Sequence, residues 1–343
     1  MAVRRRNYYR NYHGRRSKGK IAVALLLLLV IIAAVIVILM QRNIVYDETG
    51  APRLDVPWQE ETKEPQETPE LDLVIQEPIK EVDEVRAVRL AADNMTLAGL
   101  DTVLAGNAVC NAVVVPLKDP AGKVLFESET AVNGSSAFTE ETMAVLERLV
   151  SDENYYTIAQ FSCFHDPKAA IADVDGMGLK NTGGFIFYDG NNSQWMDPAK
   201  PAARQYLCDL AVDAAELGMD EILLVDFGYP TYGKLDKISY GETAKSENLL
   251  AFLQELRAAL EPYGVGLSVQ LPEVVLTDGQ EEASGLVLAE IVTVVDRVYV
   301  PALPEEADAM AQSVRALRED VVLVPILEEA AAEMTGNFLL NQA

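Results

Sequence analysis

The chain has 343 residues, half of them hydrophobic, which is enough for one large domain or two small ones. Its formal net charge is −25, but the first twenty residues hold eight Arg or Lys and no acid, which leaves −33 on the remainder (−25 less the eight positive charges). Such an acidic body repels phosphate backbones, so nucleic acid is excluded as a partner. The chain has three cysteines, none in a CxxC spacing, and two histidines, so the sequence predicts no metal site. It contains neither GxGxxG nor GxxxxGK[ST], so it predicts no nucleotide cofactor and no other cofactor.

The N-terminal segments differ sharply in composition. Residues 21–40 contain no charged or polar side chain and are long enough to cross a bilayer, so we expect one transmembrane helix. Residues 1–20 form a basic tail that should stay in the cytoplasm, because positive flanks remain inside. Residues 41–82 are rich in Glu and Pro and predict a disordered, extended stalk. These features predict a single-pass protein of the cell membrane, with residues 83–343 outside the cell.

Within residues 83–343, predicted strands and helices alternate with short loops. The strands are expected at 85–92, 111–119, 156–166, 221–227, 265–271, 296–303 and 321–329, and the last eight residues can form one more. The helices are expected at 139–150, 201–218, 248–264, 285–292 and 306–319. Eight strands favour an α/β fold of the (β/α)8 TIM-barrel type, with an open doubly wound sheet as the alternative.

Acidic residues follow several of these strands, where the active sites of such barrels lie. Asp226 directly follows the apolar run Ile-Leu-Leu-Val, so it should mark the rim of a cleft. Asp166 and Asp119 end two earlier strands and complete our set of candidate catalytic residues. Paired carboxylates suit hydrolysis of glycosidic bonds, in which one acid protonates the leaving oxygen and a second attacks carbon or activates water. Asp119 is also read as a turn residue, and Asp166 as a helix N-cap.

Aromatic and amide side chains near these acids are candidates for binding a sugar. Tyr188 and Trp195 offer flat apolar faces within YDGNNSQWMDP, and Asp197 lies in the same stretch. Tyr229 follows the strand that bears Asp226, and Gln270 ends the next strand. Trp195 has the alternative role of a plug in the barrel mouth, and Asp197, before Pro198, that of a helix cap.

The segment WMDPAKPAARQYLCDLAVDAAELGMDEILLVDFGYP resembles the central signature of a bacterial family of glycoside hydrolases with a (β/α)8 barrel. NAVVVPLKDPAGKVLFES is similar to an earlier segment of that family. The resemblance implies a secreted or membrane-anchored protein, typical of Gram-positive bacteria. It matches the family's pattern at five positions: Asp119, Trp195, Asp197, Asp226 and Pro230.

The chain departs from the family's pattern at three positions. Pro116 stands where the family has an acid, Gln160 where it has a basic residue, and Gly228 where it has an arginine. We therefore keep two hypotheses: a hydrolase of a cell-surface or environmental polysaccharide, or a degenerate non-catalytic barrel that binds glycan or acts as a cell-envelope scaffold. The sequence does not indicate an oligomeric state.

Overall fold

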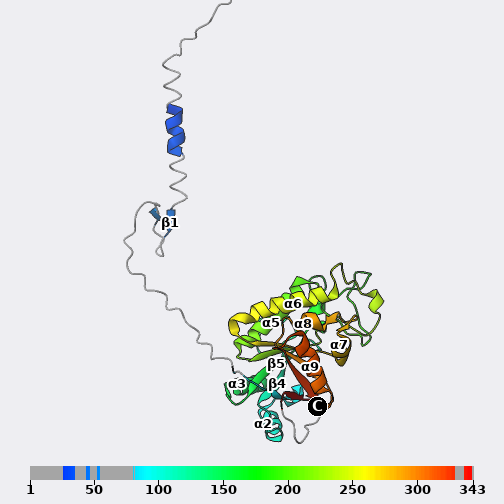
Figure 1. Ribbon diagram of the computed structural model, residues 1–343. Coiled ribbons are helices and arrows are strands. Elements are labelled where there is room, and N and C mark those ends of the chain that lie inside the picture. The colour runs from blue at the N-terminus through cyan, green and yellow to red at the C-terminus, as the bar shows by residue number, and fades with distance from the viewer. Residues whose placement is uncertain are drawn as a thin grey trace, which may run out of the picture. The chain divides into compact units, whose positions relative to one another are not determined.

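The computed structural model describes residues 26–34, 44–46, 52–54, 80, 82–328 and 336–341. The chain divides into two compact units, Met1–Val74 and Ile75–Ala343. In the first unit, β1 (Ile44–Tyr46) pairs antiparallel with β2 (Pro52–Leu54) (Figure 1). These two strands lie within residues 41–82, the stretch for which the sequence predicts an extended stalk.

The predicted membrane segment, residues 21–40, is described only at 26–34, where it is helical. Among the described residues, no helix is both long and apolar enough to span a membrane. The basic tail of residues 1–20 lies outside the described residues, as does the Glu- and Pro-rich stretch 55–79.

The second unit is built around a closed barrel of eight parallel strands, which confirms the TIM-type fold and excludes the open sheet. Each predicted strand is present, although all are shorter than expected. In barrel order the strands are β3 (Arg86–Arg89), β4 (Ala112–Lys118), β5 (Tyr156–Ser162), β6 (Glu221–Val225), β7 (Gly266–Gln270), β10 (Arg297–Pro301), β11 (Val322–Leu327) and β12 (Phe338–Leu340).

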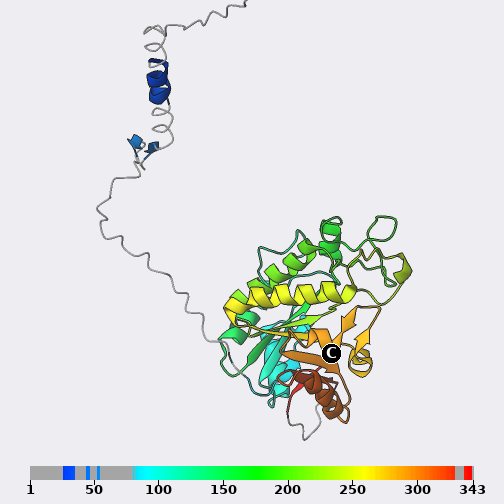
Figure 2. The same cartoon turned by 45° about the horizontal axis from the view of Figure 1, so that its top comes forward.

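Helices surround this barrel, and Figure 2 shows the two longest, α5 and α6, side by side along one flank. The bounds are α2 (Leu97–Gly106), α3 (Glu140–Ser151), α4 (Pro167–Ala172), α5 (Pro201–Glu216), α6 (Lys245–Leu260) and α9 (Ala307–Leu317). Local sequence sets several of these limits. The Thr139 hydroxyl accepts from the backbone N–H of Thr142 at the start of α3, and Gly218, with φ +101°, follows the end of α5.

The crossover from β7 to β10 departs from the expectation of a helix over 285–292. It consists of α7 (Glu273–Asp278), a hairpin of β8 (Gln280–Glu281) with β9 (Leu286–Val287), and the four-residue α8 (Leu288–Ile291). Only the second half of the predicted segment is helical, because its first two apolar residues pair with β8. The hairpin therefore replaces a long covering helix on this side of the barrel.

Two apolar clusters form the core. One lies between the barrel wall and the helices, and the other fills the barrel interior with inward-facing side chains. Members of the inner cluster include Ala87, Ile158, Tyr299 and Leu339. Because side chains alternate along a strand, the next inward positions toward the strand C-termini after Ala87 and Ile158 are Arg89 and Gln160. The interior thus changes from apolar to polar as it approaches that end.

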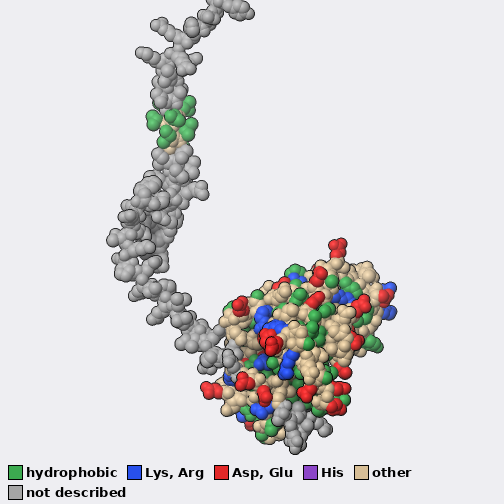
Figure 3. Space-filling model, viewed as in Figure 1, with side chains coloured by type: hydrophobic (Ala, Val, Ile, Leu, Met, Phe, Trp, Pro, Cys, Tyr) green, Lys and Arg blue, Asp and Glu red, His purple; other side chains and the backbone are tan. Residues whose placement is uncertain are grey.

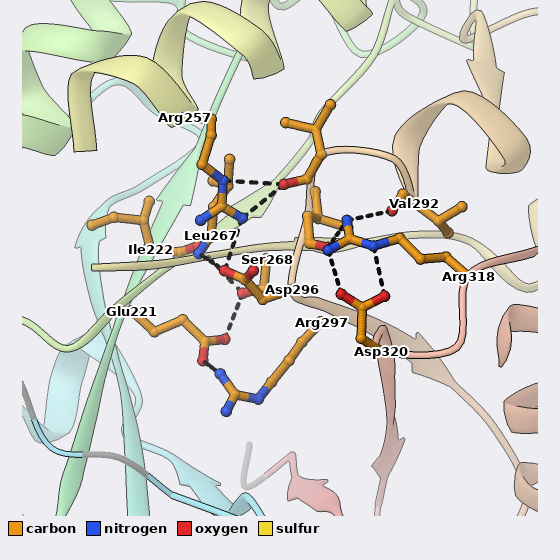
Figure 4. A network of polar contacts seen from close by, with 12 residues as sticks. Glu221, Ile222, Arg257, Leu267, Ser268, Val292, Asp296, Arg297, Arg318 and Asp320 are labelled. Carbon is orange, nitrogen blue, oxygen red and sulfur yellow. Dashed lines mark hydrogen bonds and ion pairs between the residues drawn. The ribbon is translucent and has the colours of Figure 1, made fainter. Parts of the chain in front are cut away.

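The opposite end of the barrel carries a network of charged side chains, in which Figure 4 shows Glu221 beside Arg297. The Glu221 carboxylate, at the start of β6, pairs with the Arg297 guanidinium at 2.5 Å and accepts from the hydroxyls of Ser268 at 2.6 Å and Tyr299 at 2.9 Å. Glu221 is completely buried, and side chains of the protein bind both oxygens of its carboxylate. This network stabilises the strand N-termini, away from the rim where Asp226 lies.

Acidic side chains are distributed over the visible face of the barrel unit rather than gathered in one patch (Figure 3). This distribution agrees with the strongly negative formal charge of the chain. A polyanion approaching the barrel unit would therefore meet an unfavourable field.

Candidate functional site

A cavity of about 330 Å³ opens where β6, β7 and β10 end. Its lining residues are Trp195, Asp226, Phe227, Gly228, Tyr229, Thr231, Gln270, Leu271, Pro272, Glu281, Ser284, Leu286 and Pro301. A second hollow, against α6 and α8, holds about 10 Å³, which is room for little more than one water. The larger cavity lies at the catalytic end of a TIM-type barrel and is the candidate site.

Asp226 is the exposed carboxylate of this cavity. It follows the last residue of β6 and adopts φ +48°, a left-handed conformation that is uncommon for a residue other than glycine. The Ser162 hydroxyl, at the end of β5, donates to its Oδ2 at 2.6 Å. An unusual backbone angle at a strand end turns the side chain away from the strand's alternation, and such strain is often found at functional sites. Asp226 thus lines the cavity directly after β6, and a catalytic role for it stays a prediction.

The floor beneath the cavity is polar. Arg89 donates from Nη2 to Oε1 of Gln270 at 2.9 Å and from Nη1 to Oδ1 of Asn341 at 2.7 Å. Burial lowers the pKa of the Arg89 guanidinium. The Gln160 Oε1 atom is buried and has no hydrogen-bond partner among the described residues. Of these residues only Gln270 lines the cavity, and its amide is of the kind that hydrogen-bonds sugar hydroxyls.

Trp195 forms one wall and is fixed in place by two neighbours. Its indole N–H donates to Asp189 Oδ2 at 3.0 Å. Its ring stacks on the His165 imidazole, with centroids 4.5 Å apart and planes inclined by 9°. His165 Nε2 is in turn 2.7 Å from the Ser193 hydroxyl. Because one face of the indole is covered by His165, a ligand would use the other face or the edge.

Asp166 does not face the cavity, contrary to its assignment as a candidate catalytic acid. It is completely buried, caps α4 by accepting from the Ala169 N–H at 2.8 Å, and pairs with the Lys118 ammonium at 2.9 Å. Lys118 also donates to the backbone carbonyls of Ser162 and Cys163. The ion pair thus braces the end of β5 from outside the barrel, and the N-cap interpretation of Asp166 holds.

Asp119 is likewise a structural residue. Its Oδ1 accepts from the backbone N–H groups of Ala121 at 3.0 Å and Lys123 at 2.7 Å. These bonds form a turn, which was the alternative role predicted for Asp119. Asp119 is not among the residues that line the cavity. Its position does not support a catalytic role.

The predicted substrate-binding residues divide into two groups. Trp195, Tyr229 and Gln270 line the cavity. Tyr229 is nearly buried, its hydroxyl accepts from Asn248 at 3.0 Å, and burial followed by the nearby Asp197 raises its pKa. Tyr188 is 48% exposed but does not line the cavity.

Asp197 is the second substrate-binding assignment that the structure corrects. It is 6% exposed, and its Oδ1 accepts from the Ala199 N–H at 3.0 Å in the turn before α5. It does not cap that helix, whose N-cap residue is Lys200. Burial raises the pKa of this carboxyl group.

Three residues of the site were not among the sequence-based candidates. Glu281 lines the cavity from the β8–β9 hairpin, Ser162 contacts Asp226, and Arg89 forms the floor. The signal for the hairpin was a pair of glycines, Gly279 directly before β8 and Gly285 in the loop directly before β9, which have φ +78° and +80°. In the part of the chain that the structure describes, no cluster of three or more His, Cys, Asp or Glu side chains could hold a metal ion.

Residues 90–304, well over half of the chain, match the family model described as "Putative glycosyl hydrolase domain". The chain belongs to this family. The match confirms the resemblance drawn from the 195–230 segment. No curated protein matches the sequence.

Solved structures that resemble the chain include three bacterial proteins. A hypothetical protein from Ruminiclostridium thermocellum ATCC 27405 is 27% identical, with a TM-score of 0.46, and the match covers 53% of this chain and 95% of that one. The PgaB (BpsB) glycoside hydrolase domain from Bordetella bronchiseptica is 14% identical (TM-score 0.49; 72% and 84% covered). The PelA glycoside hydrolase domain from Pseudomonas aeruginosa is 17% identical (TM-score 0.41; 71% and 83% covered).

Proposed function

We propose that the barrel hydrolyses glycosidic bonds of a cell-surface or environmental polysaccharide, with Asp226 as a catalytic carboxylate. The observation that carries this proposal is the position of Asp226, exposed in a cavity at the end of β6 and beside the fixed indole of Trp195. Membership of a glycosyl hydrolase family supports the same reaction class. In this reaction Asp226 acts on the anomeric carbon, either directly or through a water molecule.

The remaining lining residues supply binding rather than chemistry. Trp195 offers an apolar surface against which a sugar ring can stack, and Gln270 offers amide groups to its hydroxyls. Arg89 holds Gln270 from below, so the amide is oriented before a ligand arrives. A screen of bacterial cell-wall and environmental polysaccharides, with released reducing ends as the readout, tests the proposal on the intact protein. Release of product from at least one glycan is expected, and no release from any of them would reject hydrolysis.

A binding function without catalysis is the second candidate. The family's pattern has an acidic residue at the position of Pro116 and a basic residue at the position of Gln160. Both positions face the barrel interior toward the strand C-termini, so this chain lacks two charged side chains there. The same screen separates the two functions, because this alternative requires glycan that stays bound while no reducing ends appear.

We also propose that residues 21–40 anchor the protein in the cell membrane, with the tail 1–20 in the cytoplasm and the barrel outside. The twenty uncharged residues and the basic flank support this arrangement. Protease added to intact cells should digest the barrel, and the N-terminal fragment should remain with the membranes. A barrel that is protected in intact cells and digested only after lysis would contradict the proposed orientation.

A further inference from the structure

Glu281 shares the cavity with Asp226, and these two are the carboxylates among its described lining residues. Asp226 comes from the end of a barrel strand, whereas Glu281 comes from the β8–β9 hairpin in the crossover after β7. Glu281 is partly buried and Asp226 is exposed. A glycosidase needs two such groups on one cavity, since one must protonate the leaving oxygen while the other acts at carbon.

The hairpin that carries Glu281 is attached directly to the segment that follows Asp226. The Tyr229 N–H donates to the Ser284 carbonyl at 2.9 Å. At Gly228, which has φ +152°, a Cβ would lie 3.2 Å from the Ser284 Cβ, so the two backbones approach closely because this residue has no side chain. The Lys245 ammonium donates to the carbonyls of Glu282 at 3.1 Å and Ala283 at 2.8 Å. These contacts fix the position of Glu281 relative to Asp226.

Each of the two carboxylates has a serine hydroxyl with a second acceptor within reach. Ser284 Oγ lies 2.6 Å from Glu281 Oε2 and 3.2 Å from the Glu281 carbonyl. Ser162 Oγ lies 2.6 Å from Asp226 Oδ2 and 3.1 Å from the His165 carbonyl. A hydroxyl has one proton to donate. It can donate to an ionised carboxylate, or accept from a protonated one while its own proton turns to the carbonyl.

From this arrangement we infer that Glu281 is the general acid that acts with Asp226. The inference rests on the proposed function and adds a second catalytic residue to it. Glu281 gives its proton to the glycosidic oxygen as the bond from that oxygen to the anomeric carbon breaks. Asp226 removes a proton from the water that adds to the carbon, or forms an ester with the carbon that water then opens, returning a proton to Glu281. Each course consumes one water and leaves two hydroxyl-bearing products.

The division of roles follows from exposure and attachment. Glu281 is partly buried and comes from the hairpin on one side of the cavity, which suits a group that acts on the leaving oxygen. Asp226 lies at the end of a barrel strand, which suits a carboxylate that a rigid element must hold beside the anomeric carbon. The Ser284 hydroxyl accommodates Glu281 in both protonation states, as a group that gives up a proton and regains it requires.

The experiment compares Glu281→Gln with Glu282→Gln, which changes the exposed neighbouring acid that does not line the cavity. Each intact variant is assayed on the glycan that the wild type cleaves and on the 2,4-dinitrophenyl glycoside of the same sugar. The 2,4-dinitrophenyl group leaves as a stable phenolate anion and needs no proton. Only cleavage of the glycan therefore depends on a general acid. We expect Glu281→Gln to lower kcat/KM on the glycan by roughly 10²- to 10⁴-fold and on the aryl glycoside by less than about 10-fold. Glu282→Gln should behave as the wild type on both.

Equal losses on both substrates would assign Glu281 a structural role, and no loss on either would assign it none; each result overturns the inference while the proposed function stands. A wild type that cleaves neither substrate would overturn the proposed function itself.

Ser284→Ala is a second test variant that keeps the Glu281 carboxyl group, in case Glu281→Gln does not fold. Loss of the donated hydrogen bond should lower kcat/KM on the glycan more than on the aryl glycoside, because the hydroxyl positions the carboxyl group that protonates the leaving oxygen. Equal effects on both substrates would also overturn the inference.

Discussion

The hydroxyl of Ser162 donates a hydrogen bond of 2.6 Å to the Asp226 carboxylate, and this bond links the ends of two adjacent barrel strands. Ser162 is completely buried, so no water can replace its hydroxyl without rearrangement. We predict that Ser162→Ala lowers kcat/KM by roughly 10- to 100-fold, the worth of one hydrogen bond to a charged group. The loss should fall on kcat rather than on KM, because the hydroxyl positions the reacting carboxylate and does not line the cavity itself.

Ser268→Ala is the matched control for this prediction. It also removes a completely buried hydroxyl on a barrel strand that donates to a carboxylate, Glu221, but at the far end of the barrel. It should lower the unfolding midpoint and leave kcat close to that of the wild type. If both variants lower kcat alike, the effect of Ser162 is structural.

The Lys118–Asp166 ion pair supports the end of β5, and both side chains are 0% exposed. Asp166→Asn should retain the cap on α4, since an amide oxygen can accept from the Ala169 N–H, but it leaves the Lys118 charge buried without a counter-ion. We expect the unfolding free energy to fall by about 3–5 kcal/mol, measured by urea denaturation. Asp175→Asn, which breaks an exposed pair with Lys180, should change it little.

The same variant decides the role of Asp166 in the reaction. Under conditions where Asp166→Asn is folded, its kcat on the glycan should remain within a few-fold of the wild type, because the carboxylate does not line the cavity. A loss of 10²-fold or more, with the fold intact, would restore Asp166 as a catalytic acid.

The Trp195 indole reports on ligand binding by fluorescence. The chain has two tryptophans, Trp58 and Trp195, so Trp58→Phe leaves a single emitter at the cavity. In that background Asp189→Ala should weaken binding of an oligosaccharide by roughly 10-fold, because the indole loses its hydrogen bond and its fixed orientation. Asp189→Asn, which keeps an acceptor for the indole N–H, should bind nearly as the parent does; equal weakening in both variants would show that charge, not orientation, matters.

Asp197 gives a prediction for stability against pH. Burial raises the pKa of its carboxyl group in the folded protein above the ordinary value of 3.8. The native state therefore holds this proton more tightly than the unfolded chain, so stability declines as pH rises from that ordinary value through the folded-state pKa. Asp197→Asn should accordingly be more stable than the wild type at pH 7, and the difference should disappear toward pH 3.8. A gain that is independent of pH, or a loss of glycan affinity, would contradict this account.

The fold was predictable because its signals are local. Strands such as β6 and β11 are short, mostly apolar runs, and helices such as α3 begin at a recognisable cap. The segment 285–292 was misassigned because a short apolar run fits a strand or a helix equally well, and the pairing of Leu286 with Glu281 decided between them. Strand ends extended too far in the prediction where β5 stops at Ser162 and the chain turns into α4.

The candidate site was predictable only in part. Asp226 and Gln270 were found because they end strands, which is a property of sequence order. Glu281 was missed because its approach to Asp226 depends on how the hairpin packs on Gly228. Lys118 shows the same limit: a register shift between Pro116 and Lys118 places Lys118 opposite Phe161, on the outer side of the barrel, where it meets Asp166.

The most direct measurement is the rate at which the intact wild type and Asp226→Asn release reducing ends from the glycan that the wild type cleaves. Asp236→Asn, an exposed acid of the loop after β6, serves as the matched control. We predict that Asp226→Asn is slower by roughly 10³-fold while its unfolding curve and glycan affinity remain close to those of the wild type. Equal rates for the wild type and Asp226→Asn would contradict the central claim that this carboxylate carries the reaction.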